Sequence, residues 1–237
     1  YLKPLQENME FAVASQISPS GMTLAGKHQA GVLSIGAMVA EGMRSLPTQW
    51  SFAEESAAKH GNSVDRKNWR IVMNWHIAET RKEARLQAKE GLLRHNNDYS
   101  VATLNPDEGT IYKSPDDAVD GVAFSENSTA VIGTPDDLIA KIKEMISITG
   151  GFGCVIGFAH DWANRENTLK SWDLVARYVI PEINGLLDDY RESHEFVTNN
   201  RETWVRAREA VMNKIESNER SAEIMKTQGY EGEKSKS

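Results

Sequence analysis

Apolar stretches of strand length alternate with helical patterns along most of the chain. The apolar stretches begin at residues 11, 31, 69 and 152, and a helical pattern follows each of them. Several are apolar on consecutive positions, as in "GVLSIGA" (31–37), which is typical of parallel strands with both faces covered. The pattern predicts an α/β fold, either half of an eight-stranded (β/α)8 barrel or an open doubly wound sheet. Spacing alone does not choose between the two.

Two segments interrupt or follow this alternation. Residues 96–130 lose all periodicity, and a connection of that length predicts an inserted loop or a mobile lid. Order returns over 133–151, where Thr134, Pro135 and Asp137 form a strong helix start. Another amphipathic helix is expected near 200–225. We therefore divide the chain into an α/β domain over 1–183, which carries the 96–130 insertion, and a helical extension over 184–237.

Composition limits the classes of function. The chain has 237 residues, 40% of them hydrophobic, and can bury a sizeable core. Its net charge of −7 gives no basic stripe for nucleic acid, and no apolar run is long enough to span a bilayer. The single cysteine, Cys154, permits no internal disulfide, which fits a cytoplasmic protein, and is interpreted as a small core residue. The six histidines are too scattered to predict a metal site.

The first strand ends on a run of small hydrogen-bonding residues, "SQISPSGM" (15–22). If Ser18 is the N-cap, Pro19 takes the first helical position, and the amides of Ser20, Gly21 and Met22 point outward beside two hydroxyls. Ligands collect at such strand ends in parallel α/β folds, so the run predicts a phosphate site. The alternative is that Ser18 only caps its own helix.

Two histidines lie near predicted strand ends. His160, in "FAHDWA", stands where barrel strands present catalytic or cofactor-contacting side chains, and its imidazole could donate a hydrogen bond to an oxygen of a ligand. The alternative there is that Asp161 caps the next turn while Trp162 packs beneath a helix. His76, in "MNWHIAET", follows a tryptophan in an apolar run, which favours a satisfied core histidine over a functional one.

Four motifs, in this order, resemble the C-terminal half of the bacterial luciferase-like flavin monooxygenases. They are "VASQISPSGMTLAGKHQAGVLSIGA", "WRIVMNWHIAETRKEAR", "VIGTPDDLIAKIKEM" and "TGGFGCVIGFAHDWANRENTLKSWDLVARYVIP". The resemblance covers about residues 9–183 and is strongest to the limonene monooxygenase-like branch, through "SPSG", "AGKH" and "GFAHDWA". It implies a (β/α)8 TIM barrel that binds FMN at the carboxyl ends of its strands, with this chain supplying strands five to eight.

The resemblance also implies roles for particular residues. The flavin phosphate would be held by the loop after the first strand, through Gln16, Ser18, Ser20, Gly21 and Met22. Gln16 departs from the serine or acid that luciferases use nearby. Ser34 and Gly36 are small enough to let the flavin ring approach, or are small for strand packing.

The implied reaction is oxygenation of an apolar substrate. FMN, reduced by NAD(P)H through a separate flavin reductase, would react with O2 to a C4a-hydroperoxide that inserts one oxygen atom. Two alternatives stay open: a deazaflavin-dependent oxidoreductase of the same superfamily, and a non-catalytic barrel subunit.

The chain starts at Tyr1 rather than at a methionine. Four strands of a barrel would leave two open edges and an uncovered interior. We therefore expect either a missing N-terminal half or assembly into a homo-oligomer.

Overall fold

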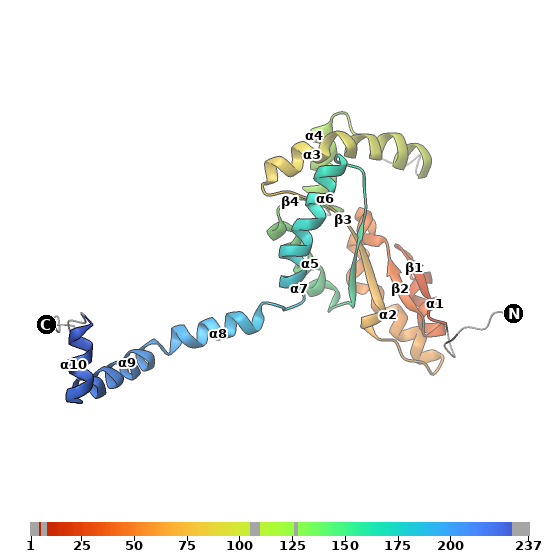
Figure 1. Ribbon diagram of the computed structural model, residues 1–237. Coiled ribbons are helices and arrows are strands. Elements are labelled where there is room, and N and C mark those ends of the chain that lie inside the picture. The colour runs from red at the N-terminus through yellow and green to blue at the C-terminus, as the bar shows by residue number, and fades with distance from the viewer. Residues whose placement is uncertain (1–4, 6–8, 105–109, 126–127, 229–237) are drawn as a thin grey trace. The chain divides into compact units, whose positions relative to one another are not determined.

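The computed structural model describes residues 5, 9–104, 110–125 and 128–228. These residues form two compact units, Tyr1–Asn184 and Gly185–Ser237 (Figure 1). The first unit contains the sheet and the helices that pack on it, and the second is helical.

The sheet of the first unit has five parallel strands. They are β1 (Ala12–Ser15), β2 (Gly31–Ser34), β3 (Trp69–Ile77), β4 (Ala130–Gly133) and β5 (Cys154–Phe158). β3 is the central strand: its first part pairs with β2 and β5, and its last part pairs with β4 (Figure 1). The predicted α/β fold with a parallel sheet is therefore confirmed.

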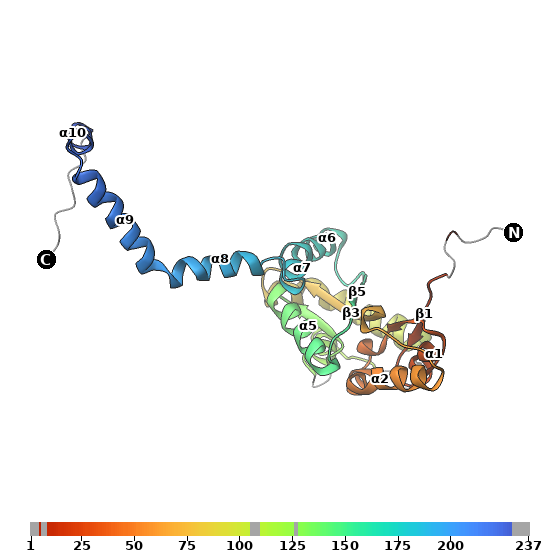
Figure 2. The ribbon, with the colours of Figure 1, turned by 90° about the horizontal axis from the view of Figure 1, so that it is seen from below.

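Helices follow the strands in chain order. The first unit has α1 (Ser20–His28), α2 (Ala40–Lys59), α3 (Arg81–Arg94), α4 (Pro115–Ala123), α5 (Pro135–Thr149), α6 (Arg165–Leu174) and α7 (Ile180–Ile183). Short 3-10 helices η1 (Gly36–Met38) and η2 (Arg66–Asn68) and π-helical segments η3 (His95–Leu104) and η4 (Val175–Val179) join them. Figure 2 shows α1 beside α2 and next to β1.

The main core lies between one face of the sheet and α1, α2 and α5. Alternate residues of β3, among them Ile71, Met73 and Ile77, point into it together with Val32 of β2. Trp69 is fully buried there and stacks on Trp50 of α2, with ring centroids 5.2 Å apart. We call this the packed face of the sheet.

A smaller core occupies the other face at the end of β3 and at β4. Ala84, Ala88 and Leu92 of α3 pack there with Ile132 of β4 and Val119 of α4. Arg85 of α3 adds ion pairs to two aspartates of α4, which are short but exposed.

The described part of residues 96–130 is not the structureless loop that the lost periodicity predicts. The described part of this segment holds η3 and α4, and Ala130 begins β4. β4 is only four residues long, and all four are buried, so it shows no alternation that a sequence pattern could reveal. The sheet consequently has one strand more than the four that we predicted.

The opposite face of β1, β2 and β5 is open in this unit. In-register residues of neighbouring strands point to the same face, and the register joins Ala14 to Leu33, Leu33 to Arg70 and Arg70 to Cys154. Of this row, Ala14 and Cys154 are exposed, and Leu33 and Arg70 are half-buried. Phe158, at the end of β5, is 46% exposed. We call this side of β1, β2 and β5, with the residues just named, the open face.

Cys154 is not the small core residue that the sequence predicts. Its side chain is exposed on the open face. The reason is the two-residue period of a strand: Val155 points to the packed face, so Cys154 points away from it.

We expect Cys154 to react rapidly with a thiol reagent such as DTNB in the isolated chain. It is the only cysteine, so the labelling reports on the open face alone. If a complementary barrel half covers this face, adding that half should slow labelling at least about tenfold, because a buried thiol is inaccessible. Equal labelling rates with and without the added half would contradict a covered open face.

The second unit contains α8 (Asp188–Asn199), α9 (Arg201–Glu216) and α10 (Glu219–Thr227). The single helix expected near 200–225 is thus two helices. The break falls at Asn218, whose side chain caps α10 by accepting a hydrogen bond from the Ser221 amide. In the described part of the chain, none of the helices combines the length and apolarity needed to cross a membrane.

Candidate functional site

The loop after β1 is held in place by Gln49 of α2. This amide is buried, accepts a hydrogen bond from the Ser15 hydroxyl at 3.3 Å and donates one to the Ile17 carbonyl at 2.6 Å. These two hydrogen bonds fix the loop on α2, while residues 16–20 of the loop are exposed. No sequence pattern pointed to Gln49, because a lone glutamine in an amphipathic helix is usually a surface residue.

Helix α1 begins one residue later than expected. Pro19, not Ser18, is the N-cap, and its carbonyl accepts the first helical bond from the Thr23 amide at 2.8 Å. The first turn has no side-chain cap and no acidic residue. The amides of Ser20, Gly21 and Met22 lack hydrogen-bond partners among the described residues. The start of α1 thus combines free amides, a partial positive charge and two exposed hydroxyls, which suits an anion.

The glycines of this region serve close packing. A Cβ on Gly21 would lie 2.6 Å from the Ala14 carbonyl, so only glycine lets α1 begin this close to the end of β1. A Cβ on Gly36 would lie 2.5 Å from the Gln16 carbonyl, which brings the loops after β1 and β2 into contact. Met22 is fully buried in the core, main chain included, so the structure does not support a contact between Met22 and a ligand at the start of α1.

Ser34 points to the packed face. It is 2% exposed and accepts a hydrogen bond from Trp69 Nε1 at 2.8 Å. This position favours the packing alternative and does not support contact between its hydroxyl and a ligand on the open face.

His160 lies in an aromatic cluster just after β5. Its ring stacks on Trp162 at 4.2 Å with an interplanar angle of 7°, and the rings of His95 and Phe158 lie 4.8 Å from it. His160 Nε2 is 2.9 Å from Oδ1 of Asn74, which is on β3. Burial in this cluster, with a smaller contribution from neighbouring His95, lowers the pKa of His160 to about 4. His160 is therefore uncharged at neutral pH.

The other residues weighed at strand ends have structural partners. His76 is buried, its Nε2 lies 2.9 Å from Gln87 Oε1, and burial lowers its pKa. This is the satisfied core histidine that we favoured. Asp161 is exposed and does not cap the following helix: Asn164 caps α6 through the Asn167 amide. Trp162 is buried against Gly91 of α3.

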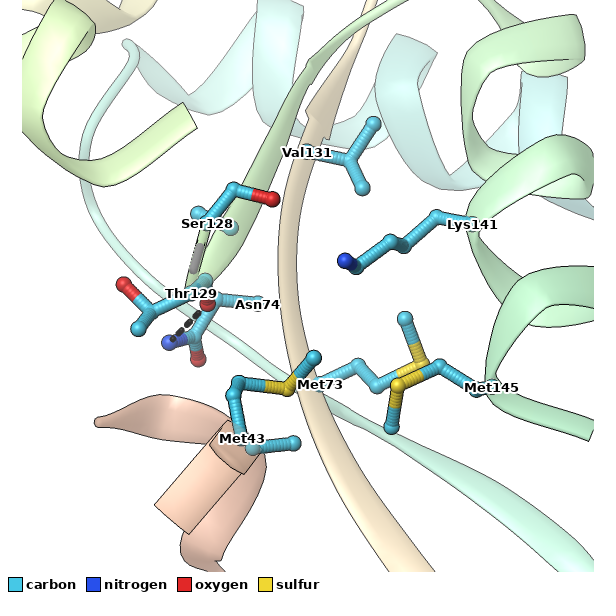
Figure 3. Close-up of a pocket in the computed structure, with 10 residues that line it drawn as sticks. Met43, Met73, Asn74, Ser128, Thr129, Val131, Lys141 and Met145 are labelled. Carbon is cyan, nitrogen blue, oxygen red and sulfur yellow. Dashed lines mark hydrogen bonds between the residues drawn. The ribbon is translucent and has the colours of Figure 1, made fainter. Parts of the chain in front are cut away.

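A small pocket beside the end of β3 is lined by three methionines, Met43, Met73 and Met145. Figure 3 shows Lys141 reaching toward it from α5, and the hydrogen bond between Asn74 and the Thr129 carbonyl at its edge. Its volume of about 10 Å³ holds at most one water molecule. A pocket of about 610 Å³ lies elsewhere, at the amino ends of β1 to β3, where Arg70 lines it. Neither contains the loop after β1 or His160.

The structure thus brings some of the predicted site residues together but not all. The loop of residues 16–20 meets Gly36, whereas no described contact joins either to His160. Asn74 and His95 both contact His160, but neither is among the site residues that the sequence predicts. The signal for Asn74 is its place in "RIVMNWHI", where an amide interrupts an apolar strand.

Known proteins were compared with this chain. No protein-family model matches it. It is 34% identical over 191 residues to 4-hydroxyprotoasukamycin monooxygenase of Streptomyces nodosus subsp. asukaensis, which covers 80% of this chain and 51% of that protein. It is 35% identical over 178 residues to limonene 1,2-monooxygenase of Rhodococcus erythropolis, covering 75% of this chain and 45% of that protein.

The fold is similar to the crystal structure of the monooxygenase RslO1 from Streptomyces bottropensis, with a TM-score of 0.56 and 20% identity. That match covers 73% of this chain and 48% of the other. The chain spans about half the length of the curated relatives that it matches. The resemblance found in the sequence is confirmed, and the chain belongs to the luciferase-like monooxygenase family.

Proposed function

We propose that this chain is the C-terminal half of a flavin-dependent monooxygenase barrel, which inserts one oxygen atom from O2 into an apolar organic substrate. Its named relatives are monooxygenases, aligned over most of this chain. The cofactor proposed is FMN, reduced by NAD(P)H through a flavin reductase. We propose an apolar substrate because the sequence most resembles the limonene monooxygenase-like branch of the family.

One observation carries the cofactor proposal: the start of α1 is free to bind an anion. It has no side-chain cap and no acidic residue in its first turn, and the exposed hydroxyls of Ser18 and Ser20 flank it. The terminal phosphate of FMN would accept hydrogen bonds from these hydroxyls and from the amides of Ser20 and Gly21. Gln49 would support the loop from below through Ser15 and the Ile17 carbonyl.

The bound flavin would supply the electrons that activate O2. The residues of this chain would bind and orient it and keep water away. Leu33, Ile156 and Phe158 are apolar residues of the open face that would shield the reacting groups once that face is covered. Gln16 and Gly36 would shape the edge of the flavin site through their backbones.

The open face supports the half-barrel part of the proposal. A barrel turns one face of its strands inward, and in the described part of the chain β1 and β5 expose Ala14, Cys154 and Phe158 on such a face. Residues outside 1–237, or another chain, would supply the remaining strands. In this division residues 1–183 form the half-barrel with 96–130 as an insertion, and 184–237 form the helical extension.

We expect the complete barrel, supplied with reduced FMN and an apolar terpene such as limonene, to incorporate one atom of ¹⁸O from ¹⁸O2 into the product. Mass spectrometry of the product measures the label, and H2¹⁸O with ordinary O2 is the control. A product labelled from water would contradict a monooxygenase. Substrate reduction without O2 consumption would indicate hydride transfer by a deazaflavin instead.

A further inference from the structure

Asn74 holds His160 by one end of its side-chain amide and the main chain by the other. Its Nδ2 donates to the Thr129 carbonyl at 3.3 Å, and its Oδ1 lies 2.9 Å from His160 Nε2 (Figure 3 shows the first of these bonds). A backbone carbonyl can only accept, so the end of the amide that faces Thr129 must be the NH2 group. The end that faces His160 is therefore the oxygen.

An amide oxygen accepts hydrogen bonds and cannot donate them. His160 Nε2 must consequently carry the proton, which leaves Nδ1 of a neutral ring without one. Among the described residues, none hydrogen-bonds to Nδ1. The ring cannot easily turn to exchange its two nitrogens, because it is stacked on Trp162 and is flanked by His95 and Phe158.

We infer that Asn74 is a positioning residue that fixes His160 as the Nε2–H tautomer, so that Nδ1 serves as a hydrogen-bond acceptor for an O–H or N–H group of a ligand. The ligand assignment rests on the proposed function, since it places a flavin or its substrate at the carboxyl ends of the strands. The tautomer does not depend on it.

The charges around His160 agree with a neutral ring. Its ionisable neighbours are His95, at the start of η3, and Asp161, the next residue along the chain. Burial and His95 lower the pKa of His160, and the Asp161 carboxylate raises it by less. An acceptor at Nδ1 is therefore present throughout the neutral pH range, and protonation in acid would abolish it.

The test combines nitrogen NMR with two variants of the assembled barrel. In the unsubstituted protein, long-range ¹H–¹⁵N spectra should show His160 with a protonated Nε2 and a bare Nδ1. Asn74→Leu should give a mixture of tautomers, because nothing then accepts from Nε2. Asn74→Asp should keep the tautomer and raise the pKa of His160 by at least about one unit, because a carboxylate replaces the neutral amide. Asn213→Asp, on exposed α9, is the control for the added charge.

Turnover separates a positioning role from a purely structural one. In Asn74→Asp the acid limb of the kcat/KM profile should move to higher pH by as much as the pKa of His160, and activity should recover at high pH. A dominant Nδ1–H tautomer, or an unshifted profile despite a raised pKa, would overturn the inference. Absence of turnover in the unsubstituted barrel with the Nε2–H tautomer present would count against the proposed function only.

Discussion

Residues 1–237 expressed alone should self-associate and bind FMN poorly, and a complementary barrel half should restore both a defined particle and flavin affinity. The physical reason is the open face of β1, β2 and β5, which carries Leu33, Ile156 and the 46% exposed Phe158. Exposed apolar sheet faces and unpaired strand edges associate in water. Light scattering measures the particle size, and flavin fluorescence measures the affinity.

A pair of variants makes this test specific to the open face. Phe158→Lys should reduce self-association of the isolated chain and also weaken complementation, since a charge would be buried when the halves join. Leu186→Lys, at a residue 67% exposed in the second unit, should leave complementation unchanged. A soluble monomer of the unsubstituted chain with a sharp thermal transition and full FMN affinity would contradict the half-barrel and favour a self-sufficient open sheet.

Replacing both Ser18 and Ser20 by alanine should weaken FMN binding strongly. A hydrogen bond to a charged phosphate contributes about 1.5–3 kcal/mol, so each lost hydroxyl should raise the Kd about 10- to 150-fold. Both hydroxyls are exposed and neither caps α1, so the fold should tolerate the change. The Kd is measured by flavin fluorescence in the assembled barrel.

Two controls isolate the phosphate from the rest of the flavin. Riboflavin lacks the phosphate, and its affinity should be the same in the double variant and in the unsubstituted protein. Ser51→Ala removes an exposed hydroxyl of α2 that donates to the Thr48 carbonyl, and it should leave the Kd for FMN unchanged. An unaltered Kd for FMN in the double variant would remove the start of α1 from the site.

Much of the fold was predictable from sequence because its signals are local. The apolar runs of β2, β3 and β5 show as strands, since backbone geometry sets a period within a few residues. The start of α5 is also local: Thr134 and Asp137 form a capping box around Pro135, as expected. The family resemblance was readable for the same reason, because its motifs are short continuous runs.

What only the tertiary structure decided depends on which strands pair and which face each residue turns to. β4 became a strand through its register with the end of β3, although its own four residues show no alternation. Register also placed Ser34 on the packed face, which decided between its two alternatives, and Cys154 on the open face, opposite to the core position that we predicted. Asn74 and His160 are 86 residues apart and meet only because β5 pairs with β3. No local period carries information on such a contact, since it is set by chain topology and by burial of the whole sheet.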